Sequence, residues 1–409
     1  MISISGLLCA HQSYGDSLRY QHGASQARHG TGGDRGPVVV WNSTQACNLH
    51  CLHCYSESGC VKPVNELDTS EAKAFIDDLA SFRVPVLLIS GGEPFMRPDL
   101  LELAAYAISR GIRVTISTNG TLITANTARQ MKQIGISYVG ISLDGLQDTH
   151  DRFRRQKGAF DRALKGIRHC LDVGQKVGLR LTLHQENLHQ LDDMFDLLKE
   201  EKIPRACFYH LVYSGRGQAI QSLDLTANET RQALDTIMKR TMEAHARGMQ
   251  QEILTVDNHA DNIYLYLKLR ERNPAMAEQV LGRMRLSGGN RTGIAIGEVD
   301  WHGNVHPDQF TRNHRLGNIR NQPFSEIWTQ TDHPILNGLR DRKPLLEGRC
   351  ASCNWLDVCN GNFRARAEAV SGRFWSSDPA CYLTEEEISL RLDAHPPAVA
   401  ETFRKVEEA

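Results

Sequence analysis

Three observations predict an α/β fold in which a partial (β/α)6 barrel is followed by a smaller, cysteine-bearing domain. Six short apolar runs alternate with amphipathic stretches between residues 38 and 212. Polar and cysteine motifs follow several of these runs, at the strand ends where active sites of such folds lie. After Gly293 the composition shifts toward Gly, Trp, His, Asn and Pro, and a second group of cysteines appears.

The predicted elements follow one another in a regular order. The run at 84–90 (VPVLLIS) is apolar almost throughout, which suits a strand buried on both faces of a parallel sheet. Thr69 or Ser70 is expected to cap the first helix. The predicted strands span 38–44, 84–90, 112–118, 138–143, 176–183 and 205–212, and the predicted helices span 69–82, 98–110, 124–134, 158–173 and 189–202. Six such units indicate a partial barrel, since a closed barrel has eight.

The same pattern divides the 409 residues into five segments. We expect a leader without periodicity (1–36), the partial barrel (37–224), a helical bridge (225–290), the small domain (291–385) and a C-terminal tail (386–409).

Net charge and the length of the apolar runs limit the partners and the location that we expect for this protein. The formal net charge is -1, from 47 basic and 48 acidic residues, so electrostatics gives no reason to expect nucleic acid or a membrane surface as a partner. No apolar run approaches the roughly 20 residues that span a bilayer, and residues 1–36 lack the pattern of a secretion signal. We therefore expect a cytoplasmic protein. In that compartment, closely spaced cysteines indicate metal binding or catalysis rather than disulfides.

The first cysteine group directly follows the first predicted strand. Cys47, Cys51 and Cys54 form a C-x3-C-x2-C loop. Three thiolates can hold three irons of a [4Fe-4S] cluster and leave the fourth iron open to another ligand. The alternative is a zinc site that also uses His50 and His53, although structural zinc sites usually pair their ligands as two separated dyads.

Polar residues follow the next three strands at the same edge of the predicted sheet. Glycines let the backbone approach a ligand closely, a carboxylate can pair with an ammonium group, and Ser, Asn and Asp can bind hydroxyl and carboxylate groups. Helix capping and turn formation are the alternative roles of each residue. These candidates are Gly91, Gly92, Glu93 and Pro94, then Ser117 and Asn119, then Ser142 and Asp144.

The second cysteine group supplies four thiolates, a complete ligand set for a closed [4Fe-4S] cluster. It has the spacing C-x2-C-x5-C-x21-C and consists of Cys350, Cys353, Cys359 and Cys381. A four-cysteine zinc knuckle is the alternative that the spacing alone permits.

The two cysteine groups and the Gly-Gly-Glu-Pro motif resemble those of the radical S-adenosylmethionine (SAM) superfamily with a SPASM or twitch extension. The resemblance implies two [4Fe-4S] clusters, with SAM bound at the open iron by the motifs above and by Arg180. Reduction of SAM would then give methionine and a 5′-deoxyadenosyl radical. Where full SPASM domains carry a further cysteine, this chain has the sequence His306-Pro307-Asp308, which favours one auxiliary cluster rather than two.

Within the superfamily, the sequence is most similar to the NirJ family of heme d1 biosynthesis and its relatives in the alternative heme pathway. The similar stretches are 37–42, 54–58, 306–310, 345–350, 357–364 and 377–383. The resemblance implies a radical reaction at the propionate side chains of 12,18-didecarboxysiroheme, an iron tetrapyrrole, in the metabolism of denitrification. It also implies an electron donor such as a flavodoxin or ferredoxin.

The sequence indicates the residues that would contact the substrate less clearly than those that would bind the clusters and SAM. A polycarboxylate substrate favours arginines, and its iron favours a histidine ligand. The candidates are Arg152, Arg154, Arg180, Arg312 and Arg364 for the carboxylates, and His306 and His314 for the iron.

Three other functions remain open. One is conversion of didecarboxysiroheme to iron-coproporphyrin, the second is peptide maturation, and the third is a zinc-stabilised binding protein.

Overall fold

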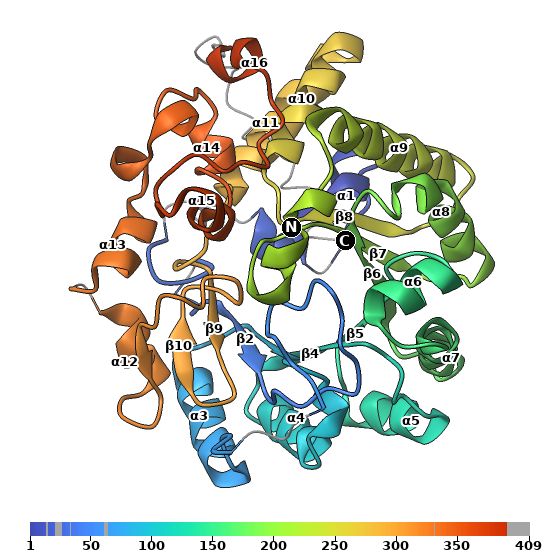
Figure 1. Cartoon of the computed structure of the whole chain (residues 1–409), viewed down its shortest axis with the longest axis vertical. Helices are drawn as coiled ribbons and strands as arrows, with labels where there is room; N and C mark the ends of the chain where they lie inside the picture. Colours follow the sequence, from blue (N-terminus) through green and yellow to red (C-terminus); the bar gives the residue numbers. More distant parts are fainter. Residues whose placement is uncertain (14, 21–26, 33, 61–63, 331, 391–409) are drawn as a thin grey trace, which may run out of the picture.

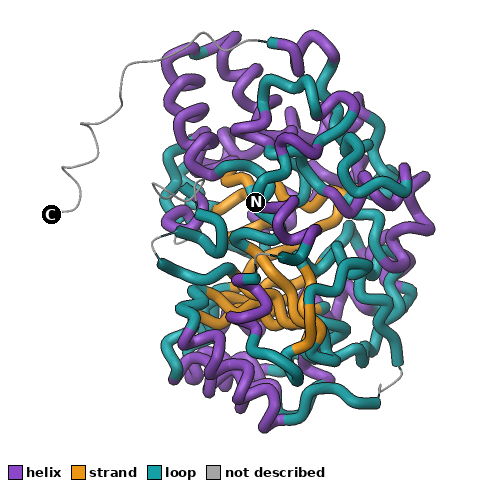
Figure 2. The backbone as a smooth tube through the Cα atoms, turned by 90° about the vertical axis from the view of Figure 1, so that its left-hand side faces the viewer, coloured by secondary structure: helices purple, strands orange, loops and turns teal. Residues whose placement is uncertain are grey.

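One mixed sheet runs through the computed structural model, which describes residues 1–13, 15–20, 27–32, 34–60, 64–330 and 332–390. In these residues eleven strands are hydrogen-bonded in the order β1-β8-β7-β6-β5-β4-β3-β2-β9-β10-β11. Strands lie at the centre of the molecule and helices surround them (Figure 2).

The six predicted strands are present and pair in parallel with their neighbours in sequence. Their side chains alternate between the barrel interior and a core shared with the outer helices. The strands are β2 (Val38–Asn42), β3 (Val86–Ser90), β4 (Arg113–Thr118), β5 (Tyr138–Ser142), β6 (Val177–Leu183) and β7 (Arg205–His210).

The helices between these strands form the outer layer of the barrel (Figure 1). They are α3 (Thr69–Ser81), α4 (Leu100–Ser109), α5 (Ala125–Ile134), α6 (Gln147–Arg154), α7 (Ala159–Asp172) and α8 (Leu191–Glu200). The capping residue of α3 is Asp68 rather than Thr69 or Ser70, because Asp68 forms a capping box with Glu71. Its buried face packs Phe75 and Leu79 into the main core.

The segment expected as a helical bridge also contributes a seventh parallel strand, β8 (Glu252–Val256), which pairs with β7. The run that forms β8 has only five residues, and hydrophobic periodicity over so short a run cannot distinguish a strand from a buried helical turn. The other elements of this segment are helical, namely α9 (Ala227–Ala246), α10 (Ala260–Arg272) and α11 (Pro274–Ser287).

The N-terminal segment, expected to lack regular structure, is partly built into the fold. Strand β1 (Ile2–Ser3) pairs antiparallel with β8 and covers its free edge. The helices α1 (Ile4–Leu8) and α2 (Asp16–Arg19) follow. Ile2, Ile4 and Leu7 are buried in the main core, so this segment contributes to stability.

The C-terminal region continues the same sheet on its other side. Strand β9 (Ile296–Val299) pairs in parallel with β2, and β10 (Asn304–His306) and β11 (Gly317–Asn318) add two antiparallel strands. The helices that cover this region are α12 (Phe324–Thr329), α13 (Pro334–Arg340), α14 (Leu356–Cys359), α15 (Arg364–Ser371) and α16 (Glu385–Ser389). Most of the tail predicted at 386–409 lies outside the described residues. Within them, the structure contains no helix with the length and apolar character of a membrane span.

Candidate active site

A cavity opens at the carboxyl ends of the parallel strands, as the sequence predicts for this fold. Most of the predicted site residues line it, although they come from four separate motifs and, for Arg180, from a fifth part of the chain. They are Cys47, Cys51, Cys54, Gly91, Gly92, Ser117, Asn119, Ser142, Asp144 and Arg180.

The three thiols of the first cysteine group pack together at one wall of this cavity. Burial raises the pKa of Cys47 to about 12 and also raises the pKa of Cys51, so these two thiols are protonated at neutral pH. Three sulfur donors that face a cavity fit a cluster with one open iron. Among the residues described, no three His, Cys, Asp or Glu side chains are arranged as the ligands of a single metal ion.

The glycine motif after β3 is packed directly against the cysteine loop. The amide of Gly92 donates to the carbonyl of Thr44 at 2.7 Å, and the amide of Glu93 donates to that of Ala46 at 2.8 Å. A Cβ on Gly92 would lie 2.2 Å from the Ala46 oxygen. The glycines therefore permit a close approach of two backbone segments that together form one side of the cavity.

Glu93 does not line the cavity, although the sequence suggests that it pairs with the ammonium group of SAM. Its carboxylate is fully buried and accepts hydrogen bonds from the Thr118 hydroxyl at 2.7 Å and the Asn119 amide at 2.8 Å. Burial raises its pKa. The structure therefore gives Glu93 a positioning role that joins the ends of β3 and β4, while Pro94 begins the short helix η2 (Pro94–Met96) behind it.

Asp144 also has its oxygens engaged by protein groups. One accepts from the Thr182 amide at 2.9 Å, and the other lies 2.5 Å from Nη2 of Arg154. Burial by itself would raise the pKa of Asp144, but the Arg154 guanidinium holds it well below its usual range. Arg154 is 8% exposed and its Nη1 donates to Sγ of Cys51 at 3.4 Å. The ion pair thus places a positive charge beside the cysteine loop.

Arg180 lies on the β6 side of the cavity. Its guanidinium donates to the Ser117 hydroxyl and stacks over the Tyr209 ring, 4.8 Å from its centroid. No carboxylate lies within 4.0 Å of it among the described residues. A charge with no acidic partner at a cavity wall is suited to bind an anion.

Several cavity residues were not assigned to this site from the sequence. His53 was considered only as a zinc ligand, and its ring stacks on Phe153 with centroids 4.7 Å apart. The others lie at the end of β7, directly after β7 and β8, or in the loop after β10, where the similar stretch 306–310 gave no role to Gln309 or Phe310. They are Tyr209, His210, Leu211, Val212, Asp257, Gln309 and Phe310.

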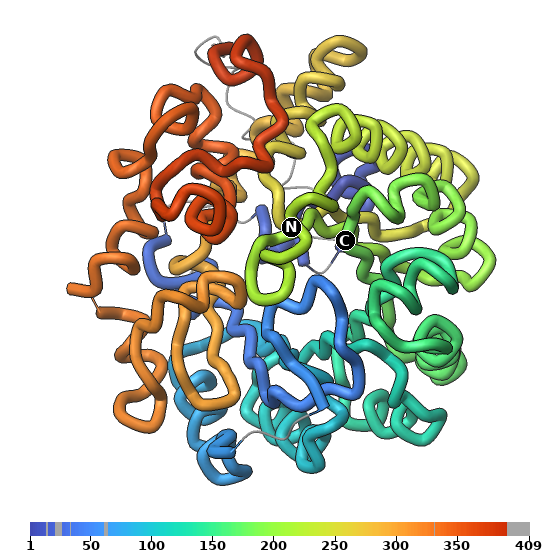
Figure 3. Tube along the Cα trace, in the orientation of Figure 1, coloured from blue at the N-terminus to red at the C-terminus, as the bar shows by residue number. Residues whose placement is uncertain are grey.

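Arg216 is a further missed residue, in the short helical segment η4 (Gly215–Leu223). Its backbone amide donates to the carbonyl of Cys54 at 3.0 Å, its Nε to Cys51 at 2.8 Å and its Nη1 to Ser58 at 2.9 Å. In Figure 3 this yellow-green segment lies beside the blue cysteine loop at the centre of the view. One arginine thus fastens the backbone of the cysteine loop from a distant part of the chain.

The second cysteine group gathers in the C-terminal region. Burial, followed by the nearby thiols of Cys381, Cys350 and Cys353, raises the pKa of Cys359 well above its usual value. Four thiols close enough to influence one another fit a fully ligated cluster. The stretch after β10 forms a turn, in which Asp308 accepts hydrogen bonds from the backbone amides of Phe310 and Thr311.

The two histidines predicted as iron ligands are engaged elsewhere. Nδ1 of His306 lies 3.1 Å from the His314 carbonyl, and Nε2 of His314 lies 2.8 Å from Glu368. Neither residue lines the cavity.

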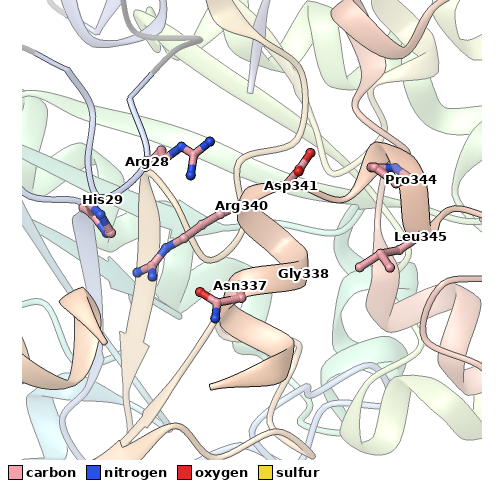
Figure 4. Close-up of a pocket in the computed structure, with 8 residues that line it drawn as sticks. All are labelled: Arg28, His29, Asn337, Gly338, Arg340, Asp341, Pro344 and Leu345. Carbon is pink, nitrogen blue, oxygen red and sulfur yellow. The ribbon is translucent and has the colours of Figure 1, made fainter. Parts of the chain in front are cut away.

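A second hollow lies between the N-terminal segment and α13 (Figure 4). It is lined by Arg28, His29, Asn337, Gly338, Arg340, Asp341, Pro344 and Leu345. Arg340 donates to the carbonyls of Gln330 and Trp328, which close the end of α12. Its guanidinium therefore has a structural role.

Comparison with known proteins agrees with this geometry. The family model of the radical SAM superfamily matches residues 41–198, and that of the SPASM iron-sulfur cluster-binding domain matches residues 296–354. Fe-coproporphyrin III synthase of Methanosarcina barkeri is 53% identical over 95% of this chain and 99% of its own. The chain belongs to the radical SAM superfamily. This membership implies SAM and [4Fe-4S] chemistry.

A second relative of this radical SAM enzyme is pre-heme d1 synthase of Dinoroseobacter shibae, which is 40% identical over 92% of this chain and 95% of its own. Among solved structures, Streptococcus suis SuiB bound to S-adenosylmethionine has a TM-score of 0.67 at 18% identity, covering 86% of this chain and 78% of its own. Native anSMEcpe with bound AdoMet has a TM-score of 0.66 at 17% identity, covering 84% and 93%. At these identities the structures show the shared fold alone.

Proposed function

We propose that this radical SAM enzyme converts the iron tetrapyrrole didecarboxysiroheme to Fe-coproporphyrin III. The observation that carries the proposal is the 53% identity to Fe-coproporphyrin III synthase, which extends over nearly the whole of both chains. Sequence reasoning gave this reaction as the alternative to a role in heme d1 biosynthesis, and the comparisons support the alternative better.

Modification of the propionate side chains on the way to heme d1 is the second candidate function. It is favoured by the 40% identity to pre-heme d1 synthase. Peptide maturation has weaker support, since the mycofactocin maturase MftC of Mycolicibacterium smegmatis is 30% identical over 84% of this chain. The zinc-stabilised binding protein has no support from these relatives.

We propose that Cys47, Cys51 and Cys54 hold the cluster that binds SAM. The cluster and SAM, once both are bound, would together supply the 5′-deoxyadenosyl radical that removes a hydrogen atom from the substrate. Arg154, fixed by Asp144, would stabilise the negative charge of the cluster ligands through its hydrogen bond to Cys51. Ser117, Asn119 and Ser142 would bind polar groups of SAM, with the backbone of Gly91 and Gly92 closing that side.

The β6–β8 side of the cavity would hold the tetrapyrrole. Arg180 offers a positive charge to a side-chain carboxylate, and Tyr209 supports its guanidinium. Leu211, Val212 and Phe310 provide apolar surface that excludes water from the reacting groups.

We further propose that Cys350, Cys353, Cys359 and Cys381 hold one auxiliary cluster, and that a flavodoxin or ferredoxin supplies electrons. The four thiols of this group can provide one ligand to each of the four irons of a closed [4Fe-4S] cluster.

The test is anaerobic incubation of the purified enzyme with SAM, a reductant and didecarboxysiroheme, followed by mass analysis of the tetrapyrrole. We expect the mass of Fe-coproporphyrin III together with 5′-deoxyadenosine. Formation of pre-heme d1 would select the second candidate. Release of 5′-deoxyadenosine with an unchanged tetrapyrrole would reject both. The matched control is the Cys47, Cys51, Cys54→Ser variant, which should form neither product.

A further inference from the structure

The β7 end of the cavity presents a histidine held by a buried carboxylate. Nε2 of His210 lies 2.9 Å from Oδ2 of Asp261, and the Tyr382 hydroxyl donates to the other oxygen of Asp261 at 2.9 Å. His210 is 6% exposed, Asp261 is fully buried, and Tyr382 comes from the C-terminal region. Three parts of the chain therefore fix the orientation of this ring.

This hydrogen bond determines which ring nitrogen remains available. Because a carboxylate can only accept, Nε2 carries the proton that is donated to Asp261. Nδ1 has no hydrogen-bond partner among the residues described, and His210 lines the cavity. A histidine that donates one N–H to a carboxylate while its other nitrogen is free has the arrangement of a metal ligand.

Other histidines do not offer the same combination. Along the described chain, the histidines that line the cavity are His53 and His210. His53 belongs to the cysteine loop and is stacked on Phe153, and its Nε2 lies 3.9 Å from Asp144, too far for a hydrogen bond. Neither His306 nor His314, the candidates from sequence, reaches the cavity.

We propose that His210 is the axial ligand to the iron of the tetrapyrrole substrate, with Asp261 as its positioning residue. The inference rests on the proposed function, since it requires an iron tetrapyrrole in this cavity. Nδ1 would donate its lone pair to the iron, and Phe310 and Leu211 would lie beside the macrocycle. The bond would fix the height and tilt of the ring, and therefore which side chain meets the SAM end of the cavity.

Protonation is consistent with this role. Burial lowers the pKa of His210, but the Asp261 carboxylate outweighs burial and raises it. In the neutral ring Nδ1 is already unprotonated, whereas in the doubly protonated ring iron binding at Nδ1 would release the proton from that nitrogen; in both cases Nε2 keeps the proton shared with Asp261. The carboxylate makes the ring a stronger ligand for the same reason that it raises the pKa.

The experiment compares binding of Fe-coproporphyrin III and metal-free coproporphyrin III to the intact enzyme under anaerobic conditions. His210→Gln keeps a side chain that can donate to Asp261 but removes the imidazole. His314→Gln is the matched control, because His314 is also paired with a carboxylate but lies outside the cavity. Iron content and circular dichroism establish that all proteins are folded and hold their clusters.

We expect wild type and His314→Gln, with the iron reduced under these anaerobic conditions, to give the high-spin ferrous spectrum of a tetrapyrrole with a single histidine ligand. His210→Gln should lose that spectrum and bind the iron form at least about tenfold more weakly, while its affinity for the metal-free form stays unchanged. Added imidazole should restore the spectrum. Asp261→Asn should weaken binding of the iron form by about tenfold for lack of the orienting carboxylate.

Retention of the histidine-ligated spectrum in His210→Gln would overturn the inference. An equal loss of affinity for the iron and metal-free forms would also overturn it, because it would show that His210 shapes the cavity without touching iron. Failure of the wild-type enzyme to bind either porphyrin would instead reject the proposed function.

Discussion

At the scale of single residues, buried charges in this enzyme are paired around the cysteine loop. Asp144 and Arg154 form an ion pair from which water is largely excluded, and Arg154 extends it to Sγ of Cys51. Removing one partner of such a pair leaves an uncompensated buried charge, which costs far more than loss of a surface pair.

Arg154→Gln tests this pair. We expect the free energy of unfolding to fall by about 3–5 kcal/mol, because Asp144 remains buried without its cation. The measurement is anaerobic urea denaturation, with Arg152→Gln as control because Arg152 pairs with Glu186 at an exposed site. A loss for Arg154→Gln no larger than that of the control, about 0–1 kcal/mol, would contradict the argument.

Gly92→Ala tests the close approach of two backbones. A Cβ 2.2 Å from the Ala46 oxygen must displace the cysteine loop, so we expect the iron content to fall by about half as the N-terminal cluster is lost. Gly282→Ala is the control, since a Cβ there on helix α11 meets nothing within 4 Å. Iron and sulfide assays give the result, and equal metal content in the two variants would refute the expectation.

At the scale of elements, the segment after β7 is what holds the cysteine loop in place. Gly215 has a φ of +54°, and a Cβ there would lie 2.5 Å from the Tyr55 oxygen. Ser214 extends the contact to the loop after β10, since its hydroxyl donates to the Phe310 carbonyl at 3.0 Å. One turn therefore joins the cysteine loop to the C-terminal region.

Arg216→Ala should remove the hydrogen bonds by which the segment after β7 holds the cysteine loop. Its side chain donates to two carbonyls of the 51–58 backbone, so we expect the variant to lose the N-terminal cluster faster in air or with a chelator, with little change in secondary structure. The measurement is the decay of the cluster absorption together with its electron paramagnetic resonance signal. Arg168→Ala, which breaks an exposed pair with Glu201, is the control and should decay at the wild-type rate.

At the scale of the whole molecule, one sheet connects the SAM half to the auxiliary region. Arg366 and Asp378, which lie between Cys359 and Cys381 in the sequence, form a buried ion pair. Arg366 also donates to the carbonyls of Leu211 at 3.1 Å and Asp257 at 2.6 Å, both at the cavity. The segment between Cys359 and Cys381 therefore helps to position one wall of the cavity.

Metal content separates the two cysteine groups. We expect about eight irons per chain in the wild-type enzyme, and about four after replacement of either cysteine group by alanine. Inductively coupled plasma analysis with a sulfide assay gives these values. Zinc in place of iron at the second group would establish a four-cysteine zinc site there.

The sequence by itself determined the barrel strands, the two cysteine groups and several residues that line the cavity. These features are local, because hydrophobic periodicity and ligand spacing act over a few consecutive residues. Only the tertiary structure decided that Glu93 faces β4, that Asp144 is engaged by Arg154, and that β8 extends the sheet. Arg216 and His210 were beyond sequence reasoning because their partners lie 165 and 51 residues away. Such contacts depend on how strands come together, and no spacing along the chain records them.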